Sequence, residues 1–215
     1  MNLLHLDPES VIQRVKSSEA AARIPSLLGS VLRGAIGFTL VSVAGFCPWI
    51  FGINPMPGNS AGMYLTCALV FVVLSGLCLH GLIIGPGTLG RFYALFSTGF
   101  LLYAFAWIYF FMNFSKHQGS LLGLFTGTAL MSAVFVQAFG AWNKLVHVVT
   151  ALFLGNLAGY YGGWVVVMDL IGYETKPTML LWGVCYGLGF GAGLGLALYA
   201  CQTRTREVLA LNGNG

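Results

Sequence analysis

The sequence has very few charged side chains. Only 7% of its 215 residues are charged, whereas an ordinary soluble domain carries roughly 25%. Ten basic and six acidic residues are too few to coat a water-soluble globule, and the mean hydropathy of +0.82 means that apolar surface has to face lipid. The scarcity of charge excludes a soluble domain. We expect the lipid bilayer as the main partner and no nucleic-acid partner.

Paired cysteines and catalytic motifs are also missing. The five cysteines are single residues in apolar runs with no CxxC pair among them, so we expect small buried apolar side chains. HExxH, DxxD and GxxxxGK[ST] do not occur, and no apolar run holds two carboxylates. A hydrolytic or group-transfer enzyme needs an acid or a base positioned with a partner. The sequence therefore favours a protein that is not an enzyme, assigns no catalytic residue or metal ligand, and leaves any cofactor unknown.

Long charge-free runs are what the sequence has instead, and they predict membrane-spanning helices because a charge at mid-bilayer costs a few kcal/mol or more. The first run, residues 34–90, is too long for one helix, and Pro55 and Pro57 interrupt it. At about 20 residues per span, we expect six helices near Leu27–Phe51, Ala61–Ile84, Arg91–Phe114, Ser120–Ala141, Leu145–Leu170 and Thr178–Cys201. The expected fold is all-α: a polytopic six-helix bundle over residues 26–202, preceded by an amphipathic segment, 1–25, and followed by a tail, 203–215.

The basic residues predict the orientation of this bundle, because Lys and Arg in short loops stay on the cytoplasmic side. With both termini inside, only Lys116 and Lys176 are external. The basic residues placed inside are Arg14, Lys16, Arg23, Arg33, Arg91, Lys144, Arg204 and Arg206. We therefore expect a multi-pass protein of the plasma (inner) membrane with both termini in the cytoplasm.

The N-terminal segment has the pattern of a short amphipathic helix. Asp7 can cap it, Pro8 suits its first position, and Val11, Ile12 and Val15 share one face. The segment lacks the short apolar core and cleavage site of a secretory signal, so we expect it to be retained. A helix on the cytoplasmic membrane surface and a helix that docks a partner are both compatible with this pattern.

Glycines recur at intervals of four residues in three successive spans. Such spacing lets helix backbones approach closely in lipid, where no hydrophobic force drives helices together. The pattern predicts Gly-rich close packing of the C-terminal half, which occurs both in narrow solute pathways and in inert bundles. The rows are Gly119, Gly123 and Gly127; Gly155, Gly159 and Gly163; and Gly183, Gly187, Gly191 and Gly195.

Aromatic residues form a continuous seam along one face of the third span, at alternating intervals of three and four. The simplest interpretation packs this bulky ridge against the glycine grooves of the fourth or sixth span. The alternative is a wall for an apolar ligand such as a pigment, a quinone or a lipid tail. The seam consists of Tyr93, Phe96, Phe100, Tyr103, Trp107 and Phe110.

Four polar residues in or near the spans are candidates for a solute pathway. His80, close to the end of the second span, is a proton-linked group, a metal or haem ligand paired with His147, or a histidine bonded to a neighbouring carbonyl. Asn156, at mid-span, must find partners on another helix or in a water-filled path. Gln137 lies near the inner end of the fourth span. Asp169 forms the mouth of a cation pathway or pairs with Lys176.

These features leave three hypotheses for function. Neutral polar lining and close packing favour a small channel or transporter for a small solute. The aromatic seam and the near absence of extramembrane structure favour a non-catalytic subunit or scaffold that binds lipid, pigment or a partner membrane protein. A membrane enzyme that acts on lipid is the third. A homo-oligomer and a complex with partner membrane subunits are both compatible with the sequence.

Overall fold

The computed structural model describes residues 4–18, 24–56, 60–172 and 175–212. Arg23 and Pro57, used above for orientation and segmentation, lie outside these ranges. All regular secondary structure in the described residues is helical, and these residues contain no strand. The elements are α1 Pro8–Lys16, α2 Leu27–Phe51, α3 Ser60–Leu79, η1 His80–Leu82, α4 Thr88–Asn113, α5 Lys116–Phe139, η2 Trp142–Lys144, α6 Leu145–Trp164, the π-helical η3 Val165–Ile171, α7 Lys176–Cys201 and α8 Thr203–Asn212.

Six of these segments are long and apolar enough to cross a membrane, as expected for a multi-pass membrane protein. They are Leu27–Phe51, Ala61–Leu82, Thr88–Asn113, Lys116–Phe139, Trp142–Ile171 and Lys176–Cys201. The predicted number of spans is therefore confirmed. The largest difference in a boundary is at the start of α5, which was expected at Ser120 and begins at Lys116, because nearby charge does not end a helix that extends beyond the apolar layer.

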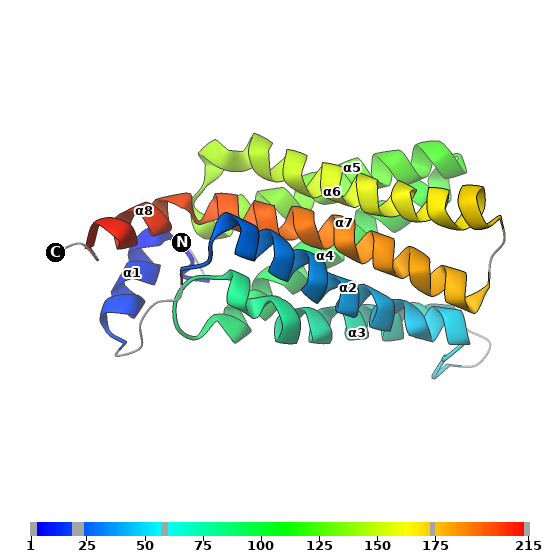
Figure 1. Cartoon of the computed structure of the whole chain (residues 1–215), viewed down its shortest axis with the longest axis horizontal. Coiled ribbons are helices and arrows are strands. Elements are labelled where there is room, and N and C mark those ends of the chain that lie inside the picture. Colours follow the sequence, from blue (N-terminus) through cyan, green and yellow to red (C-terminus); the bar gives the residue numbers. More distant parts are fainter. Residues whose placement is uncertain (1–3, 19–23, 57–59, 173–174, 213–215) are drawn as a thin grey trace.

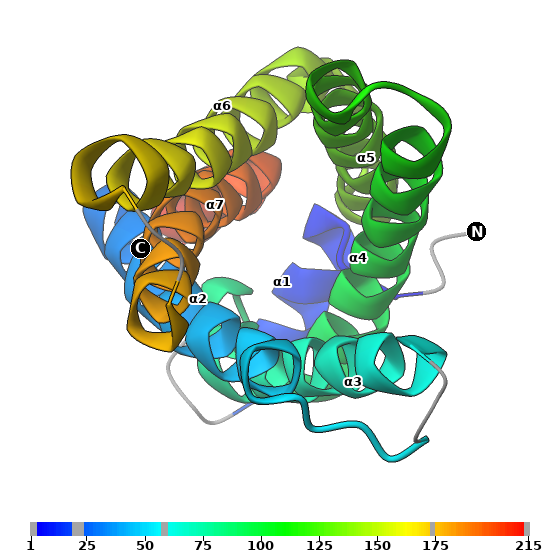
Figure 2. The same ribbon diagram turned by 90° about the vertical axis from the view of Figure 1, so that its right-hand side faces the viewer.

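The six long helices form a closed ring. Each packs against the next one along the chain, and α7 closes the ring by packing against α2. Figure 2, which looks along the bundle, shows this circular order, and Figure 1 shows that α1 and α8 lie together at one end. We call this the α1/α8 end and the other the opposite end. The ring encloses an interior that is bounded by all six spans.

Backbone contacts at glycine close the ring on both sides of α7. A Cβ on Gly191 would lie 2.3 Å from the carbonyl oxygen of Gly34 on α2, and a Cβ on Gly195 would lie 2.2 Å from that of Ser30. On the other face of α7, a Cβ on Gly189 would lie 2.5 Å from the carbonyl oxygen of Gly155 on α6. These distances are far below any real Cβ contact, so any larger residue would force the helices apart.

Part of the aromatic seam of α4 packs against α5. A Cβ on Gly123 of α5 would lie 2.9 Å from the Cα of Trp107, and one on Gly127 would lie 2.6 Å from the ring of Tyr103. Large side chains on one helix thus fit the space left by glycines on the other.

Gln202 ties the end of α7 to the loop between α3 and α4. Its side chain is 2% exposed and fully bonded. Its oxygen accepts from the backbone N–H of Ile84 at 2.7 Å, and its amide nitrogen donates to the carbonyl oxygens of Leu82 at 2.8 Å and Leu198 at 2.9 Å. A single buried amide therefore supplies hydrogen-bond partners for one backbone N–H group and two backbone carbonyl groups near the ends of η1 and α7.

Replacement of this amide should destabilise the bundle measurably. We expect Gln202→Leu to lower the free energy of unfolding in detergent by about 2 kcal/mol, because it leaves buried backbone groups without partners. Gln137→Leu is the matched control, since the Gln137 side chain is exposed and, among the described residues, bonds only Trp142. Equal thermal stability of the two variants would contradict this role for Gln202.

The amphipathic face of α1 packs against the rest of the chain. Asp7 caps the helix by accepting from the backbone N–H of Ser10 at 3.1 Å. Val11 is 2% exposed, and both Val11 and Val15 lie beside Gly85 in the loop before α4. α1 also contacts α8, a helix that was expected only as a tail. This apolar face is therefore partly covered by the protein itself.

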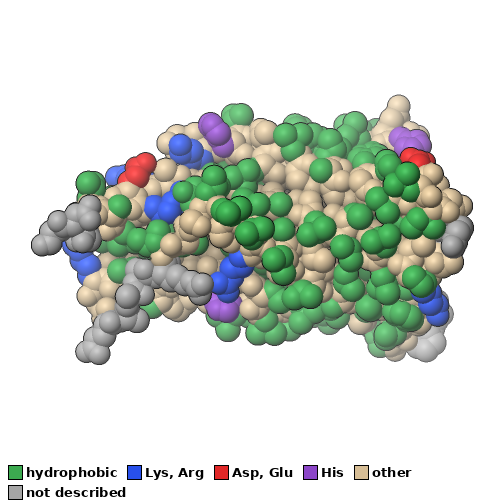
Figure 3. Space-filling model, viewed as in Figure 1, with side chains coloured by type: hydrophobic (Ala, Val, Ile, Leu, Met, Phe, Trp, Pro, Cys, Tyr) green, Lys and Arg blue, Asp and Glu red, His purple; other side chains and the backbone are tan. Residues whose placement is uncertain are grey.

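The outer surface of the ring is apolar over most of its length. On the face that Figure 3 draws, hydrophobic side chains extend across the bundle, and charged residues lie on the half that carries α1 and α8 and at the opposite tip. Exposed side chains such as Leu40, Leu69, Phe105 and Leu154 are more than half accessible. Such a surface is suited to lipid rather than water.

Candidate functional site: a polar cluster inside the helix ring

Aromatic rings fill the interior between the middle of the ring and the α1/α8 end. Phe38 of α2 is fully buried, and its centroid lies 4.9 Å from that of Phe190 on α7, 6.0 Å from Phe71 on α3 and 6.2 Å from Phe96 on α4. One phenylalanine thus bridges three other helices across the interior.

These rings continue as a stacked column along the interior. Phe92, Phe96 and Phe100 stack on one another along α4 at centroid distances of 5.5 and 5.4 Å. The column then crosses from Tyr103 to Phe190 of α7 at 5.7 Å. Stacked and tilted rings at these distances attract one another beyond their burial, so the rings of the column stabilise one another.

Polar groups from α4, α6 and α7 meet where this column ends. The hydroxyl groups of Tyr103 and Tyr186 lie 3.3 Å apart and are buried. The Asn156 side chain of α6 is 0% exposed, and Tyr103 lies close enough to interact with it electrostatically. Neither the nitrogen nor the oxygen of that amide has a hydrogen-bond partner within the described part of the chain. Asn156 is therefore a buried amide that lies close to the Tyr103 side chain but forms no hydrogen bond of normal geometry within the described residues.

A second pair of hydroxyls extends the cluster toward the opposite end. The Ser120 hydroxyl of α5 lies 3.3 Å from that of Tyr160, one helical turn from Asn156 on α6. Trp182 of α7 donates its indole N–H to the backbone carbonyl of Tyr160 at 3.2 Å. The indole nitrogen of Trp107 on α4 is also buried and has no partner among the described residues. We call Tyr103, Ser120, Asn156, Tyr160 and Tyr186 the interior polar cluster.

The interior polar cluster is electrically neutral. The buried polar side chains of the described residues are serines, threonines, one asparagine and one glutamine, and no Asp, Glu, Lys or Arg is buried among them. Hydroxyl and amide groups offer both donors and acceptors. The cluster is therefore suited to a small uncharged polar group and has no counter-charge for an ion.

The other predicted pathway residues lie away from this cluster. Gln137 is exposed near the α1/α8 end, where its oxygen accepts from the indole N–H of Trp142 at 2.9 Å. Asp169 is exposed in the π-helical segment at the opposite end. It forms no ion pair with Lys176, whose ammonium instead lies 5.2 Å from the ring centroid of Phe51. Of the four candidates, only Asn156 faces the interior polar cluster.

His80 is bonded to a neighbouring carbonyl, one of the alternatives that the sequence left open. Its Nδ1 lies 2.9 Å from the carbonyl oxygen of Gly76. His80 lines a small cavity near the α1/α8 end, whereas His147 lies on the exposed face of α6 beside a separate groove. The two histidines thus belong to different surface features.

The seam of α4 is divided among several neighbours. Phe96, Phe100 and Tyr103 are buried in the interior. Tyr93 contacts α3, where its hydroxyl donates to the carbonyl oxygen of Val73 at 2.8 Å. Trp107 and Phe110 lie beside the glycines of α5. Only the middle of the seam therefore takes part in the candidate site.

Sequence reasoning missed Ser120, Tyr160 and Tyr186 as site residues. They lie in apolar or Gly-rich runs where a hydroxyl is easily taken for packing or interfacial chemistry. One signal was present, because Asn156 and Tyr160 are four residues apart and share a helix face. Convergence with Tyr186 depends on how α6 and α7 are paired, which the spacing does not specify.

Residues Gly58 to Gly62 read Gly-Asn-Ser-Ala-Gly, the spacing of a hydrolase nucleophile elbow. That motif requires a strand before the serine and a histidine and an acid around it. Here Ser60 is the first residue of α3, Gly58 and Asn59 lie outside the described residues, and the described ranges contain no strand. The motif therefore lacks its structural context, and we assign it no catalytic role.

Comparison with known proteins found no matching family model, no similar curated protein and no similar solved structure. The geometry of the interior polar cluster is therefore the best indication of function.

Proposed function

We propose that this protein is a membrane transporter for a small uncharged polar solute, which binds at the interior polar cluster. The main support is Asn156, whose amide is fully buried and forms no hydrogen bond of normal geometry within the described residues. A buried polar group without a partner costs about 1–3 kcal/mol. Such a cost is typical of a site whose partner is a ligand.

The chemistry of the cluster indicates the class of solute. A primary amide offers two donors and an acceptor, and the Tyr103 and Tyr186 hydroxyls offer both roles. A ligand that donates and accepts, such as a small amide, urea or a polyol, would satisfy these groups. The absence of buried charge among the described side chains disfavours an ion, because desolvation of an ion would have no compensation.

The aromatic column supports a transporter in preference to an open channel. Phe38, Phe96 and Phe190 block the interior on the α1/α8 side of Asn156. Trp107 and Trp182 flank Tyr160 on the opposite side. A polar site enclosed by rings on both sides corresponds to an occluded state, from which each side must open in turn.

The membrane setting is part of the proposal. We place the protein in the plasma (inner) membrane with both termini in the cytoplasm, on the basis of the basic residues near the α1/α8 end. The glycine rows of α5, α6 and α7 then supply the close packing that holds the ring within lipid. A homo-oligomer or a complex with partner membrane subunits stays a prediction.

Solute flux into proteoliposomes tests the proposal directly. Purified protein in liposomes should speed the entry of at least one of urea, acetamide and glycerol, measured by light scattering after rapid mixing. Sodium and chloride permeability should equal that of protein-free liposomes. If all three solutes enter at the rate found without protein, the transporter proposal fails.

Removal of one hydroxyl from the cluster should slow this flux while leaving the aromatic rings in place. We expect Tyr186→Phe to reduce the rate about fivefold, because one hydrogen bond contributes about 1 kcal/mol. Tyr161→Phe is the matched control, since its hydroxyl makes no hydrogen bond within the described ranges and lies on the same helix as Asn156. Equal rates for the two variants would argue against the cluster as the solute site.

A scaffold that binds an apolar ligand is the second candidate, and a groove on the outside of the ring favours it. The groove has a volume of about 760 Å³. Its walls come mainly from α6 and α7, and include Ala151, Leu154, Gly193 and Leu196. A coloured preparation, or a stoichiometric lipid that survives purification, would support this function over solute transport.

A further inference from the structure

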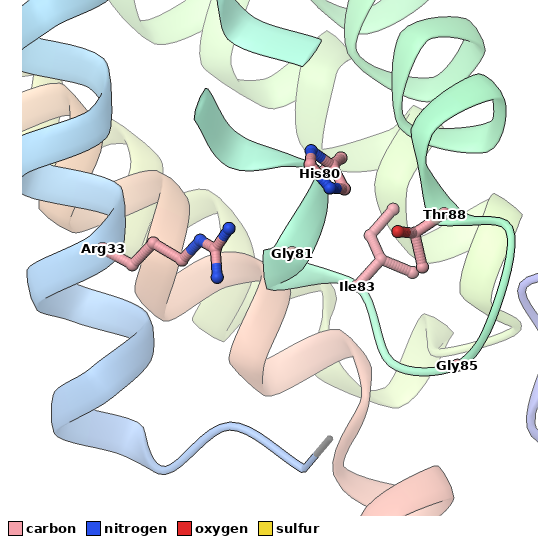
Figure 4. Close-up of a pocket in the computed structure, with 6 residues that line it drawn as sticks. All are labelled: Arg33, His80, Gly81, Ile83, Gly85 and Thr88. Carbon is pink, nitrogen blue, oxygen red and sulfur yellow. The ribbon is translucent and has the colours of Figure 1, made fainter. Parts of the chain in front are cut away.

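A small cavity lies between α2, η1 and the start of α4, near the α1/α8 end and away from the interior polar cluster. Its volume is about 220 Å³, several times the roughly 30 Å³ that one water occupies in the liquid. Arg33, His80 and Thr88 supply its polar side chains, and Gly81, Ile83 and Gly85 complete the lining. Figure 4 shows the guanidinium of Arg33 extending from α2 toward Gly81.

The cationic group of this cavity is not neutralised by any residue that the structure describes. Arg33 forms no hydrogen bond or ion pair with any residue that the structure describes, and no carboxylate is among the lining residues. The guanidinium rests against the backbone of η1, since a Cβ on Gly81 would lie 2.5 Å from its Cζ. A positive charge is therefore held over a cavity without a counter-charge.

His80 adds a second group with fixed orientation. Its Nδ1 lies 2.9 Å from the carbonyl oxygen of Gly76, so that nitrogen carries the proton and donates to the backbone. Nε2 is then the atom available to a ligand, and it can accept from a hydroxyl such as a protonated phosphate oxygen. Arg33 and His80 are the titratable residues of the lining.

We infer that this cavity binds a phosphate-type anion, with the guanidinium of Arg33 as its main contact and Nε2 of His80 as the second. A guanidinium presents paired donors that match the oxygens of a phosphate. The cavity is too small for a large ligand but has room for one phosphate group. Its position, where the apolar surface of the ring gives way to the charged end, is the depth of lipid headgroups, so the anion comes from a phospholipid or from free phosphate.

Binding measurements on the detergent-purified full chain can test this site and separate the two sources. One arm measures retention of phosphatidylglycerol against diacylglycerol by native mass spectrometry. The other measures the shift in unfolding temperature with inorganic phosphate against chloride at equal ionic strength. Selective retention of phosphatidylglycerol assigns the anion to a lipid headgroup, and a selective shift with inorganic phosphate assigns it to the free ion.

We expect Arg33→Gln to weaken the binding of whichever probe is selected by at least tenfold. Arg91→Gln is the matched control and should change it less than twofold, because Arg91 donates to the carbonyl oxygen of Gly87 and does not line the cavity. Gly81→Ala keeps the charge but should displace the guanidinium, and so should also weaken binding. If neither probe is selected by the parent protein, or if Arg33→Gln and Arg91→Gln behave alike, the inference is wrong.

Discussion

Alanine in place of Gly191 is expected to lower the free energy of unfolding by about 3 kcal/mol, measured by thermal or denaturant unfolding in detergent. The added Cβ would lie 2.3 Å from the carbonyl oxygen of Gly34 and 2.7 Å from the Cβ of Phe38. A backbone oxygen cannot rotate away as a flexible side chain can, so α2 and α7 must separate. Overpacking of this kind typically costs 1–3 kcal/mol, and a backbone clash belongs at the upper end.

Gly162→Ala is the matched control for Gly191→Ala, because it makes the same substitution at a position without a close neighbour. Gly162 also lies within a long helix, but nothing stands within 4 Å of an added Cβ. The same substitution should therefore leave stability unchanged or raise it by up to about 1 kcal/mol, through the better helix propensity of alanine. A loss of stability at Gly191 together with a gain at Gly162 would show that the close backbone contact at Gly191, and not glycine content, holds α2 against α7. Equal effects would contradict the packing described above.

The contrast between these two glycines shows what spacing alone can predict. Most glycines of the four-residue rows in α5, α6 and α7 lie close to the backbone of a neighbouring helix. The rows did not identify α2 as the partner of α7, because Gly34 and Gly37 of α2 do not form a row of that length. Which helices pair across a ring depends on shape along the whole interface, and that information is spread over many residues.

The six spans were predictable because a single strong effect, the cost of charge in hydrocarbon, determines them. The ends of the chain follow weaker effects. Docking of α1 depends on Gly85, whose φ of +100° forms a turn that presents backbone to Val11 and Val15. The pKa of Arg14 on α1 is lowered overall, because burial and the nearby charge of Arg91 outweigh the opposite effect of Asp7. None of these contacts follows from the periodicity of α1.

The interior polar cluster was predictable only in part. Asn156 stood out because a full amide in a span is rare and needs partners. Gln202 was overlooked because it lies just past the last span, although its three hydrogen bonds make it the better satisfied of the two buried amides. Burial alone therefore does not separate a structural amide from a functional one. The bonding state of each amide does.

Because the two amides differ in this way, Asn156→Leu should affect solute flux without lowering the stability of the bundle. Leucine has the same number of side-chain heavy atoms and the same branching as asparagine, and it needs no hydrogen-bond partner. Because Asn156 has no partner within the described residues, its replacement should leave the free energy of unfolding unchanged or raise it by about 1–3 kcal/mol. Solute flux into proteoliposomes should fall about tenfold or more, since the solute loses its central hydrogen-bonding group.

Two measurements on the same variant thus separate the possible roles of Asn156. If the amide joined helices, its removal should destabilise the bundle by about 1 kcal/mol, whether or not flux changed. If it binds solute, stability and flux should move in opposite directions, the pattern expected where a site is built at the expense of stability. Asn143→Leu, at an exposed amide in η2, should change neither quantity. Loss of stability together with unchanged flux would assign Asn156 to packing and remove the main support for transport.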